Sequence, residues 1–226
     1  LWEASYKNKK NSELFAFENF ISRKFNIRFN SNYKKIQEWS IKNSPDFWST
    51  FWDFSKTKGI KSKKKIRKSK IFYKNLFLPG TKLNFGQNLL SKNNDEKAIT
   101  FISENGFREE RSWKKLNFNT ASIIQFLKQI RIVKGDRVAA YMPNCIETVE
   151  AFLATTSIGG IWSSCSPDFG ANGVIERFSQ IKPKVLFITD QYYYNGKKIN
   201  VIKRLSKILE LIPSIKNVII VNYPGN

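Results

Sequence analysis

Histidine is absent from these 226 residues, and cysteine is nearly so, with only Cys145 and Cys165. Without an imidazole the chain cannot build a Ser-His-Asp or Cys-His nucleophile, a histidine-ligated zinc site or a histidine general base. Two thiols are too few for a structural zinc site or a disulfide scaffold. We interpret both as reduced thiols in or near the core, which is typical of a cytoplasmic protein.

Long apolar runs are lacking as well. The best candidate for a membrane span, residues 149–162, is short and contains Glu150. Residues 1–4 offer neither a basic leader nor an apolar stretch, so no signal peptide is indicated. We therefore expect a cytoplasmic protein with no membrane partner. Because the chain lacks an initiator Met and ends abruptly, we also expect it to be a fragment.

Acidic residues are scarce: 18 Asp and Glu stand against 39 Lys and Arg, which gives a net charge of +21. The basic excess is strongest in residues 55–74, which contain ten basic residues and no acidic one. Self-repulsion disfavours packing there, so we expect a solvated loop or hinge. A nucleic-acid-binding module that acts by counterion release is an alternative. No known module of that kind is present, so we do not expect a nucleic-acid partner.

Motifs for phosphate and acid–base chemistry are missing too. Neither G-x-x-x-x-G-K-[ST] nor a strand-terminal G-x-G-x-x-G occurs, and no pair of carboxylates stands out as an acid–base couple. We accordingly assign no catalytic residue and no metal ligand within the chain.

Apolar and aromatic residues are plentiful, at 41% and 15% of the chain, and their spacing predicts the fold. Residues 33–41 repeat apolar side chains at helical steps, and Ser44 caps a second helix, 44–54, whose aromatic stripe is typical of a core face. A short helix is expected at 84–91, a hairpin of strands 98–102 and 108–112, and a helix at 112–130. Strands then alternate with helices: strands 137–142, 161–163, 185–188 and 218–221, and helices 146–158, 171–181 and 199–211. This alternation predicts an α/β fold, a parallel sheet with flanking helices, after a mostly helical N-terminal segment.

Ligands of parallel sheets bind outside the carboxyl ends of the strands. Three loops are expected there: Pro143-Asn144, residues 163–170 and residues 189–198. Ser163, Ser164 and Cys165 could shape a substrate pocket with hydroxyl and backbone donors, or belong to a tight loop that turns into the next helix. The third loop, with Tyr192 to Lys198, could stack a base and meet a phosphate, or be an exposed turn with surface lysines.

Three stretches together resemble the acetyl- and acetoacetyl-coenzyme A synthetases. Residues 36–54 resemble the N-terminal segment of that family, and 78–90 its closing motif. Residues 135–144 and 158–170 resemble the start of the adenylate-forming domain. The most specific piece, Ile-Trp-Ser-Ser-Cys-Ser-Pro-Asp-Phe-Gly at 161–170, is similar to the acetoacetate–CoA ligases. The resemblance implies a helical N-terminal segment over 1–92, with the basic loop at 55–74, and the beginning of an AMP-binding domain over 93–226.

The activity implied by the resemblance is that of an AMP-forming acid–thiol ligase with acetoacetate, ATP, Mg²⁺ and coenzyme A as substrates and cofactors. An acetate or propionate ligase of the same fold is the alternative. The family's phosphate loop and its C-terminal lysine domain are not in this sequence. The fragment is therefore expected to bind none of these ligands tightly and to be inactive without the remainder of its own chain.

One coenzyme A contact is implied by position. In the acetyl enzymes an Arg-x-Gly-Arg stretch contacts coenzyme A, and Tyr194-Asn195-Gly196-Lys197 corresponds to it. Gly196 matches and Lys197 keeps the positive charge, whereas Tyr194 replaces the first arginine and Asn195 corresponds by position only. A lysine supplies a point charge where arginine supplies a planar fork.

Overall fold

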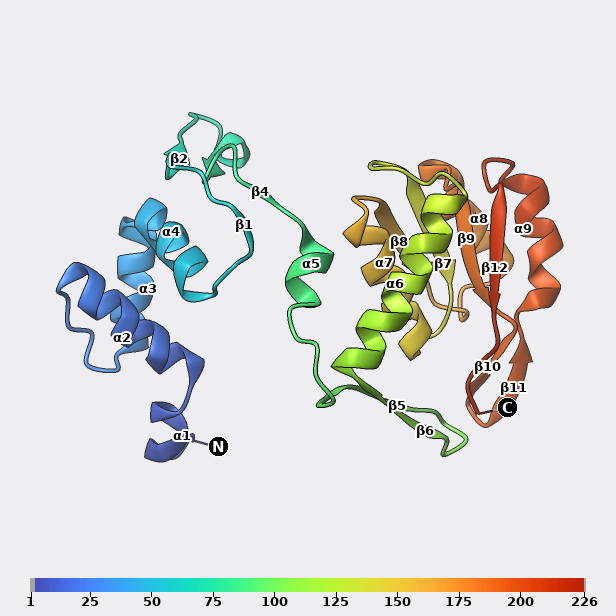
Figure 1. Cartoon of the computed structure of the whole chain (residues 1–226), viewed down its shortest axis with the longest axis horizontal. Coiled ribbons are helices and arrows are strands. Elements are labelled where there is room, and N and C mark those ends of the chain that lie inside the picture. The colour runs from blue at the N-terminus through green and yellow to red at the C-terminus, as the bar shows by residue number, and fades with distance from the viewer. Residues whose placement is uncertain (1–2, 226) are drawn as a thin grey trace. The chain divides into compact units, whose positions relative to one another are not determined.

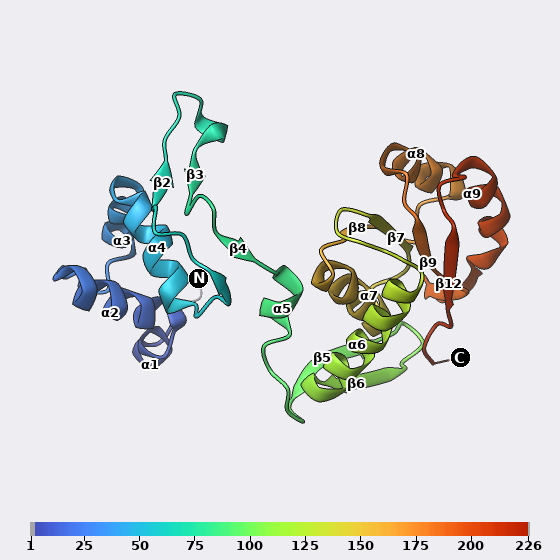
Figure 2. The ribbon, with the colours of Figure 1, turned by 45° about the horizontal axis from the view of Figure 1, so that its top comes forward.

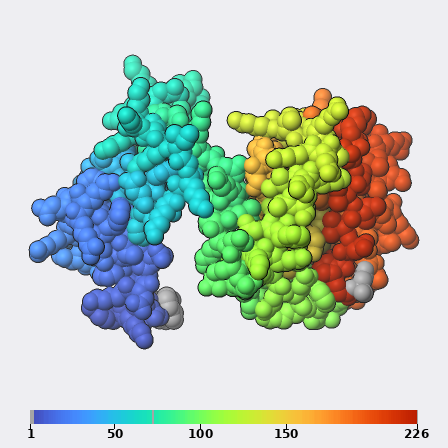
Figure 3. Space-filling view, in the orientation of Figure 1, coloured from blue at the N-terminus to red at the C-terminus, as the bar shows by residue number. Residues whose placement is uncertain are grey.

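The computed structural model describes residues 3–225. The chain divides into two compact units, Leu1–Leu83 and Asn84–Asn226, coloured from blue to green and from green to red in Figures 1 and 3. The sequence placed the domain boundary after residue 92, whereas the compact units divide after Leu83.

The first unit is built on four helices: α1 (Tyr6–Lys10), α2 (Glu13–Phe25), α3 (Tyr33–Lys42) and α4 (Ser44–Phe54). Side chains cap α2 and α3, where Ser12 Oγ accepts from Phe15 N and Asn32 Oδ1 accepts from Lys35 N, both at 3.2 Å. The predicted helices at 33–41 and 44–54 are present, and α1 and α2 lie within the helical segment expected at 1–92, although neither was predicted individually. Ser44 was expected to cap the second of these helices, which is wrong: Ser44 is the first residue of α4, and Asn43 occupies the cap position.

The aromatic stripe of α4 contributes to a small core. Phe17 from α2 lies at its centre, with ring centroids 5.8 Å from Phe47 and 4.9 Å from Phe54. Buried around it are Ile21, Phe29 and Ile36. The predicted core role of the stripe therefore holds for Phe47 and Phe54, while Trp48 is 43% exposed.

Most described residues of the basic run at 55–74 are exposed and lie outside helices and strands, as expected of a solvated loop. The run also contributes to a ribbon of two short strand pairs. In this ribbon β1 (Gly59–Ile60) pairs with β4 (Lys82–Leu83), and β2 (Ile66–Arg67) pairs with β3 (Leu76–Phe77). A short 3₁₀ turn, η1 (Phe72–Lys74), lies between β2 and β3. Figure 2 shows β2 and β3 side by side.

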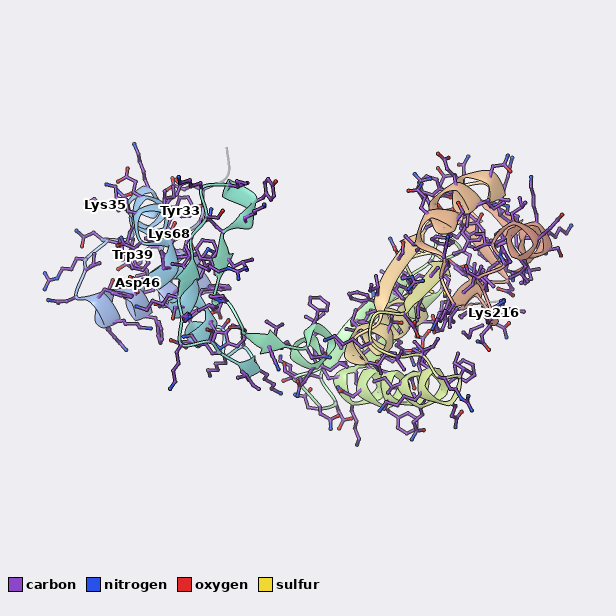
Figure 4. All side chains as sticks on the ribbon, turned by 90° about the horizontal axis from the view of Figure 1, so that it is seen from above. Tyr33, Lys35, Trp39, Asp46, Lys68 and Lys216 are labelled. Atoms are coloured by element: carbon purple, nitrogen blue, oxygen red, sulfur yellow. The ribbon has the colours of Figure 1, made fainter. Side chains whose placement is uncertain are left out.

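Carboxylates of α4 reduce the self-repulsion of this ribbon. Lys61 Nζ lies 2.6 Å from Asp53 Oδ1, and Lys65 Nζ lies 2.5 Å from Asp46 Oδ1. Lys61 Nζ also donates to the Ser49 carbonyl oxygen at 2.8 Å. Figure 4 labels Asp46 on α4 and Lys68 on the ribbon. These ion pairs were not predicted from the sequence, because the carboxylates of Asp46 and Asp53 belong to α4 and not to the basic run itself.

The second unit begins with α5 (Phe85–Leu89), the hairpin of β5 (Lys97–Ile102) and β6 (Arg108–Ser112), and α6 (Trp113–Gln129). Ser112 caps α6, as predicted, since its Oγ accepts from Lys115 N at 3.2 Å. Figures 1 and 2 both show the hairpin next to one end of α6.

A four-stranded parallel sheet in the order β12-β9-β7-β8 forms the centre of this unit. Its strands are β7 (Arg137–Tyr141), β8 (Ile161–Cys165), β9 (Val185–Thr189) and β12 (Asn217–Val221), and the helices between them are α7 (Ile146–Ser157), α8 (Ala171–Ile181) and α9 (Leu205–Leu211). Helix α6 packs with α7, and α8 packs with α9. Right-handed crossovers place these two pairs on opposite faces of the sheet. The predicted fold class, helices flanking a parallel sheet after a helical segment, is confirmed.

Two predicted elements differ from the structure. Strand β8 continues to Cys165, so Ser163 and Ser164 lie in a strand and not in a loop. The helix expected at 199–211 begins only at Leu205. Its first residues belong to a hairpin of β10 (Gln191–Tyr194) and β11 (Lys197–Asn200), followed by a 3₁₀ turn, η2 (Ile202–Arg204). Among residues 3–225, none of the helices has the length and apolarity needed to cross a membrane.

Helix α5 packs against α7 at a point where there is no room for a side chain. Asn84 caps α5 by accepting from Gln87 N at 2.9 Å and donates to the Ser157 carbonyl oxygen at 2.8 Å. A Cβ on Gly86 would lie 2.2 Å from Ser157 Oγ and 2.9 Å from Ser157 N. A glycine is therefore required at position 86 by close approach of the two helices.

We expect Gly86→Ala to lower the free energy of unfolding of the second unit by about 1–3 kcal/mol, since the added methyl group forces α5 away from α7. Gly173→Ala in α8 is the matched control, because a Cβ there would meet nothing closer than 3.6 Å. That control should be neutral or stabilise by up to about 1 kcal/mol. Urea unfolding followed by circular dichroism measures both, and equal effects would contradict the close packing at Gly86.

Candidate functional site

A cavity of about 240 Å³ opens at the carboxyl edge of the parallel sheet. The connection from β7 runs toward β8, and the connection from β9 runs the other way, toward β12. Where neighbouring strands send their connections in opposite directions, a crevice is left at their carboxyl ends. The residues that line the cavity come from the segments after β7, β8 and β9: Met142, Pro143, Asn144, Thr148, Ser164, Cys165, Ser166, Asp168, Tyr192, Tyr193 and Tyr194.

The structure thus brings the three predicted loops together at one cavity. Of the candidate residues, Ser164, Cys165 and Tyr194 line it. Ser163 does not: it lies in β8, opposite Ala139 of β7. Asn195, Gly196 and Lys197 lie next to the lining residue Tyr194, at the exposed end of the β10–β11 hairpin.

The turn of this hairpin consists of Asn195 and Gly196, with φ of 51° and 68°. Two consecutive residues of positive φ are typical of the tight turn that matches the twist of a hairpin, and Asn-Gly is the sequence that favours it. Tyr194 and Lys197 are paired directly across the hairpin. Because paired residues project from the same face, Lys197 is on the face that carries Tyr194 toward the cavity.

A carboxylate lies at the tip of the hairpin. The Gly196 N–H donates to Glu104 Oε2 at 3.3 Å. Glu104 comes from the turn between β5 and β6, so its negative charge is held near Lys197 by a segment distant in sequence. A phosphate approaching the Gly196 N–H would have to replace this contact.

A chain of hydrogen bonds runs along the cavity wall. Tyr192 Oη donates to Asp168 Oδ1 at 2.6 Å, and Ser166 Oγ donates to Asp168 Oδ2 at 2.7 Å. These two bonds hold the pKa of the Asp168 carboxyl below its usual range. Burial and the adjacent carboxylate raise the pKa of Tyr192, so its phenol stays protonated and remains a donor.

Neither thiol is set up as a nucleophile. Cys145 and Cys165 are free and buried, as predicted for core thiols. Burial raises the pKa of Cys145 to about 11 and raises that of Cys165 as well. Both are therefore neutral near pH 7, and Cys165 contributes to the cavity as a small apolar side chain.

The sequence indicated no individual role for Asp168, Tyr141 or Arg204, and Tyr192 was noted only as part of a loop that could stack a base. Asp168 lies within the loop noted for its composition. The Asn195-Gly196 dipeptide is the signal that could have revealed the hairpin and with it the position of Tyr192. No local signal indicated Arg204, which was expected in the middle of a helix.

The donors for a metal ion are not assembled here. Across residues 3–225, no group of three or more His, Cys, Asp and Glu side chains is placed to hold a metal ion. We therefore derive no step through the Mg²⁺ that the resemblance implies.

A model of the AMP-binding enzyme family matches residues 87–225, which include the whole parallel sheet and the cavity. The chain belongs to the AMP-binding enzyme family. Within this family, the acetoacetyl-CoA synthetase of Xenopus tropicalis is 36% identical over 96% of this chain and 33% of that protein. The acetoacetyl-coenzyme A synthetase of Rhizobium meliloti (strain 1021) is 34% identical over 100% of this chain and 34% of that protein.

A solved AMP-binding relative shows the same similarity in three dimensions. The acetoacetyl-CoA synthetase from Streptomyces lividans matches 100% of this chain and 35% of that chain, with a TM-score of 0.92 and 26% identity. The chain thus spans about a third of the length of these relatives. The resemblance inferred from the Trp-Ser-Ser-Cys-Ser-Pro-Asp-Phe-Gly stretch is confirmed.

The depressed pKa of Asp168 predicts a loss of stability in acid. A carboxyl whose folded pKa lies below its unfolded value stabilises the fold above the unfolded pKa, and that contribution disappears as the pH falls through the folded pKa. The free energy of unfolding should therefore decline between about pH 5 and about pH 3. The decline should be smaller in Asp168→Asn, and also in Tyr192→Phe, which removes the donor. Urea unfolding at a series of pH values measures this, and an unchanged slope in both variants would contradict it.

Proposed function

We propose that this chain is the N-terminal part of an ATP-dependent acetoacetate–CoA ligase. In that reaction the acid's carboxylate attacks the α-phosphorus of ATP, which forms an acyl-adenylate and releases pyrophosphate. The thiol of coenzyme A then attacks the acyl carbon, which forms the thioester and releases AMP. The observation that carries the proposal is the agreement of the whole chain, in sequence and in structure, with acetoacetyl-CoA synthetases.

Within that reaction, the cavity and the hairpin are proposed to receive coenzyme A. The ring of Tyr194, which is 52% exposed, offers planar apolar surface for the base, and Lys197 offers an ammonium group for a phosphate. Ser164 and Cys165 line the same cavity. Asn195 and Gly196 contribute the tight turn that places Lys197 beside Tyr194.

The sequence contains no G-x-x-x-x-G-K-[ST] phosphate-binding loop, which would supply donors and a cation to stabilise the phosphoryl transition state. We therefore propose that the adenylation chemistry requires residues outside these 226. The protein chain alone should give no exchange of pyrophosphate into ATP with acetoacetate, acetate or propionate. Measurable exchange would contradict the proposed division of the reaction.

The acid is tested in a longer protein that carries this chain at its N-terminus and has the length of the curated relatives. Release of AMP with coenzyme A should be fastest with acetoacetate, and slower with acetate and propionate. A preference for acetate would leave the AMP-forming reaction in place and refute the proposed acid.

Coenzyme A binding can be measured on the 226-residue chain by isothermal titration calorimetry. Lys197→Met should weaken binding by about fivefold, which is the scale of one exposed charge pair. Glu104→Gln should strengthen it by a similar factor, because the negative charge beside Lys197 and the incoming phosphate is removed. Lys216→Met, at a surface position labelled in Figure 4, is the charge control. Identical affinities in all four proteins would refute the proposed role of the hairpin.

A further inference from the structure

The loop between β8 and α8, residues 166–170, is held by side chains from three other elements. From β10, Tyr192 Oη donates to Asp168 Oδ1 at 2.6 Å. From β7, Tyr141 Oη lies 2.5 Å from the Phe169 carbonyl oxygen and 3.1 Å from that of Pro167. From η2, Arg204 Nη1 donates to the Pro167 carbonyl oxygen at 2.7 Å.

Arg204 also connects these contacts to one another. The same Nη1 donates to Tyr141 Oη and lies 3.5 Å from the Phe169 carbonyl oxygen. Among the described residues, the salt bridges do not include Arg204. Its donors are therefore directed to neutral oxygens of the loop and of Tyr141. All of these bonds come from the single nitrogen Nη1, at the end of the long arginine side chain.

These bonds add to a few contacts that the loop makes within itself and with α8. Within the loop, Phe169 N donates to the Ser166 carbonyl oxygen at 3.1 Å and Asp168 N to Ser166 Oγ at 3.4 Å. Ser166 and Asp168 line the cavity, so any movement of the loop changes the shape and polarity of the cavity wall. Tyr192 lines the cavity as well, and its single hydroxyl joins the two sides of the cavity through Asp168.

We propose that Arg204 and Tyr192 are positioning residues that hold loop 166–170 in the shape that admits coenzyme A. This inference rests on the proposed function of the cavity. It goes beyond that function by assigning a role to two further residues. Arg204 does not line the cavity, and Tyr192 acts through the bond from its hydroxyl to Asp168 and not through its ring.

The decisive variant is Tyr192→Phe, which keeps the ring and removes only the bond to Asp168. Tyr223→Phe is a closely matched control, because Tyr223 is also a buried tyrosine whose Oη bonds a side chain, Ser103 Oγ at 3.1 Å, away from the loop. Amide hydrogen exchange of Asp168 and Phe169 should accelerate by about tenfold in Tyr192→Phe, and stay at the wild-type rate in Tyr223→Phe. Equal exchange in the two variants would overturn the proposal.

Binding of coenzyme A to the same proteins gives the second readout. Tyr192→Phe should weaken binding by about fivefold or more, while Tyr223→Phe should bind as the wild type does even if it unfolds at a lower temperature. A loss of affinity that follows thermal stability equally in both variants would indicate a merely structural role and overturn the proposal. If the wild-type chain fails to bind coenzyme A, the proposed function of the cavity is refuted, and the exchange rates alone then decide whether the loop is held as described.

Arg204 is tested by its conservative replacement. Arg204→Lys keeps the charge but ends one covalent bond nearer the backbone than Nη1, so loop exchange should rise and coenzyme A affinity should fall nearly as much as in Arg204→Met. Lys203→Met removes a neighbouring exposed charge and should change neither quantity. Full retention of both quantities in Arg204→Lys would show that charge alone suffices and would overturn the assigned geometry.

Discussion

The candidate site depends on the parallel pairing of β7 with a strand on each side. Val138 to Tyr141 are paired in register with β8 and with β9 at once. Ala139 and Ala140 are fully buried in the centre of this sheet, and their small side chains let helices pack closely on both faces. Because the strands are parallel, their carboxyl ends meet at one edge, and everything that forms the cavity follows from that arrangement.

The sequence stretch with the most specific resemblance has a contact for almost every residue. Ser166 and Asp168 bond to each other, Pro167 presents its carbonyl oxygen to Arg204, and the guanidinium of Arg177 lies 4.2 Å from the centre of the Phe169 ring. The Pro-Asp-Phe order therefore has a physical meaning in this fold. It lets a short loop satisfy donors from two faces of the sheet while it forms one wall of the cavity.

The charged groups of the chain have different surroundings in the first unit and at the cavity. In the first unit, Asp46 and Asp53 compensate lysines of the ribbon. At the cavity the polar groups are mostly hydroxyls and carbonyls, and a carboxylate, Glu104, faces the tip of the hairpin. The +21 of the whole chain therefore does not describe the site, whose electrostatics depend on a few placed charges.

The sequence alone was sufficient for the alternation of strands and helices from Arg137 onward, because hydrophobic periodicity and helix caps are local signals. The same local signals also predicted the parallel sheet and the edge at which three loops would meet. They were insufficient where a local preference competed with distant partners. The lysine run was expected to be a solvated loop or hinge, and the ion pairs of Lys65 with Asp46 and of Lys61 with Asp53 were not predicted.

Residues 199–204 were expected to be helical, although pairing with Gln191–Tyr194 makes the first of them a strand. The roles of Tyr192 and Arg204 were decided only by tertiary structure. Each is defined by bonds to residues 24 or more positions away in the chain, and no property of its own neighbourhood in the sequence encodes such a partner.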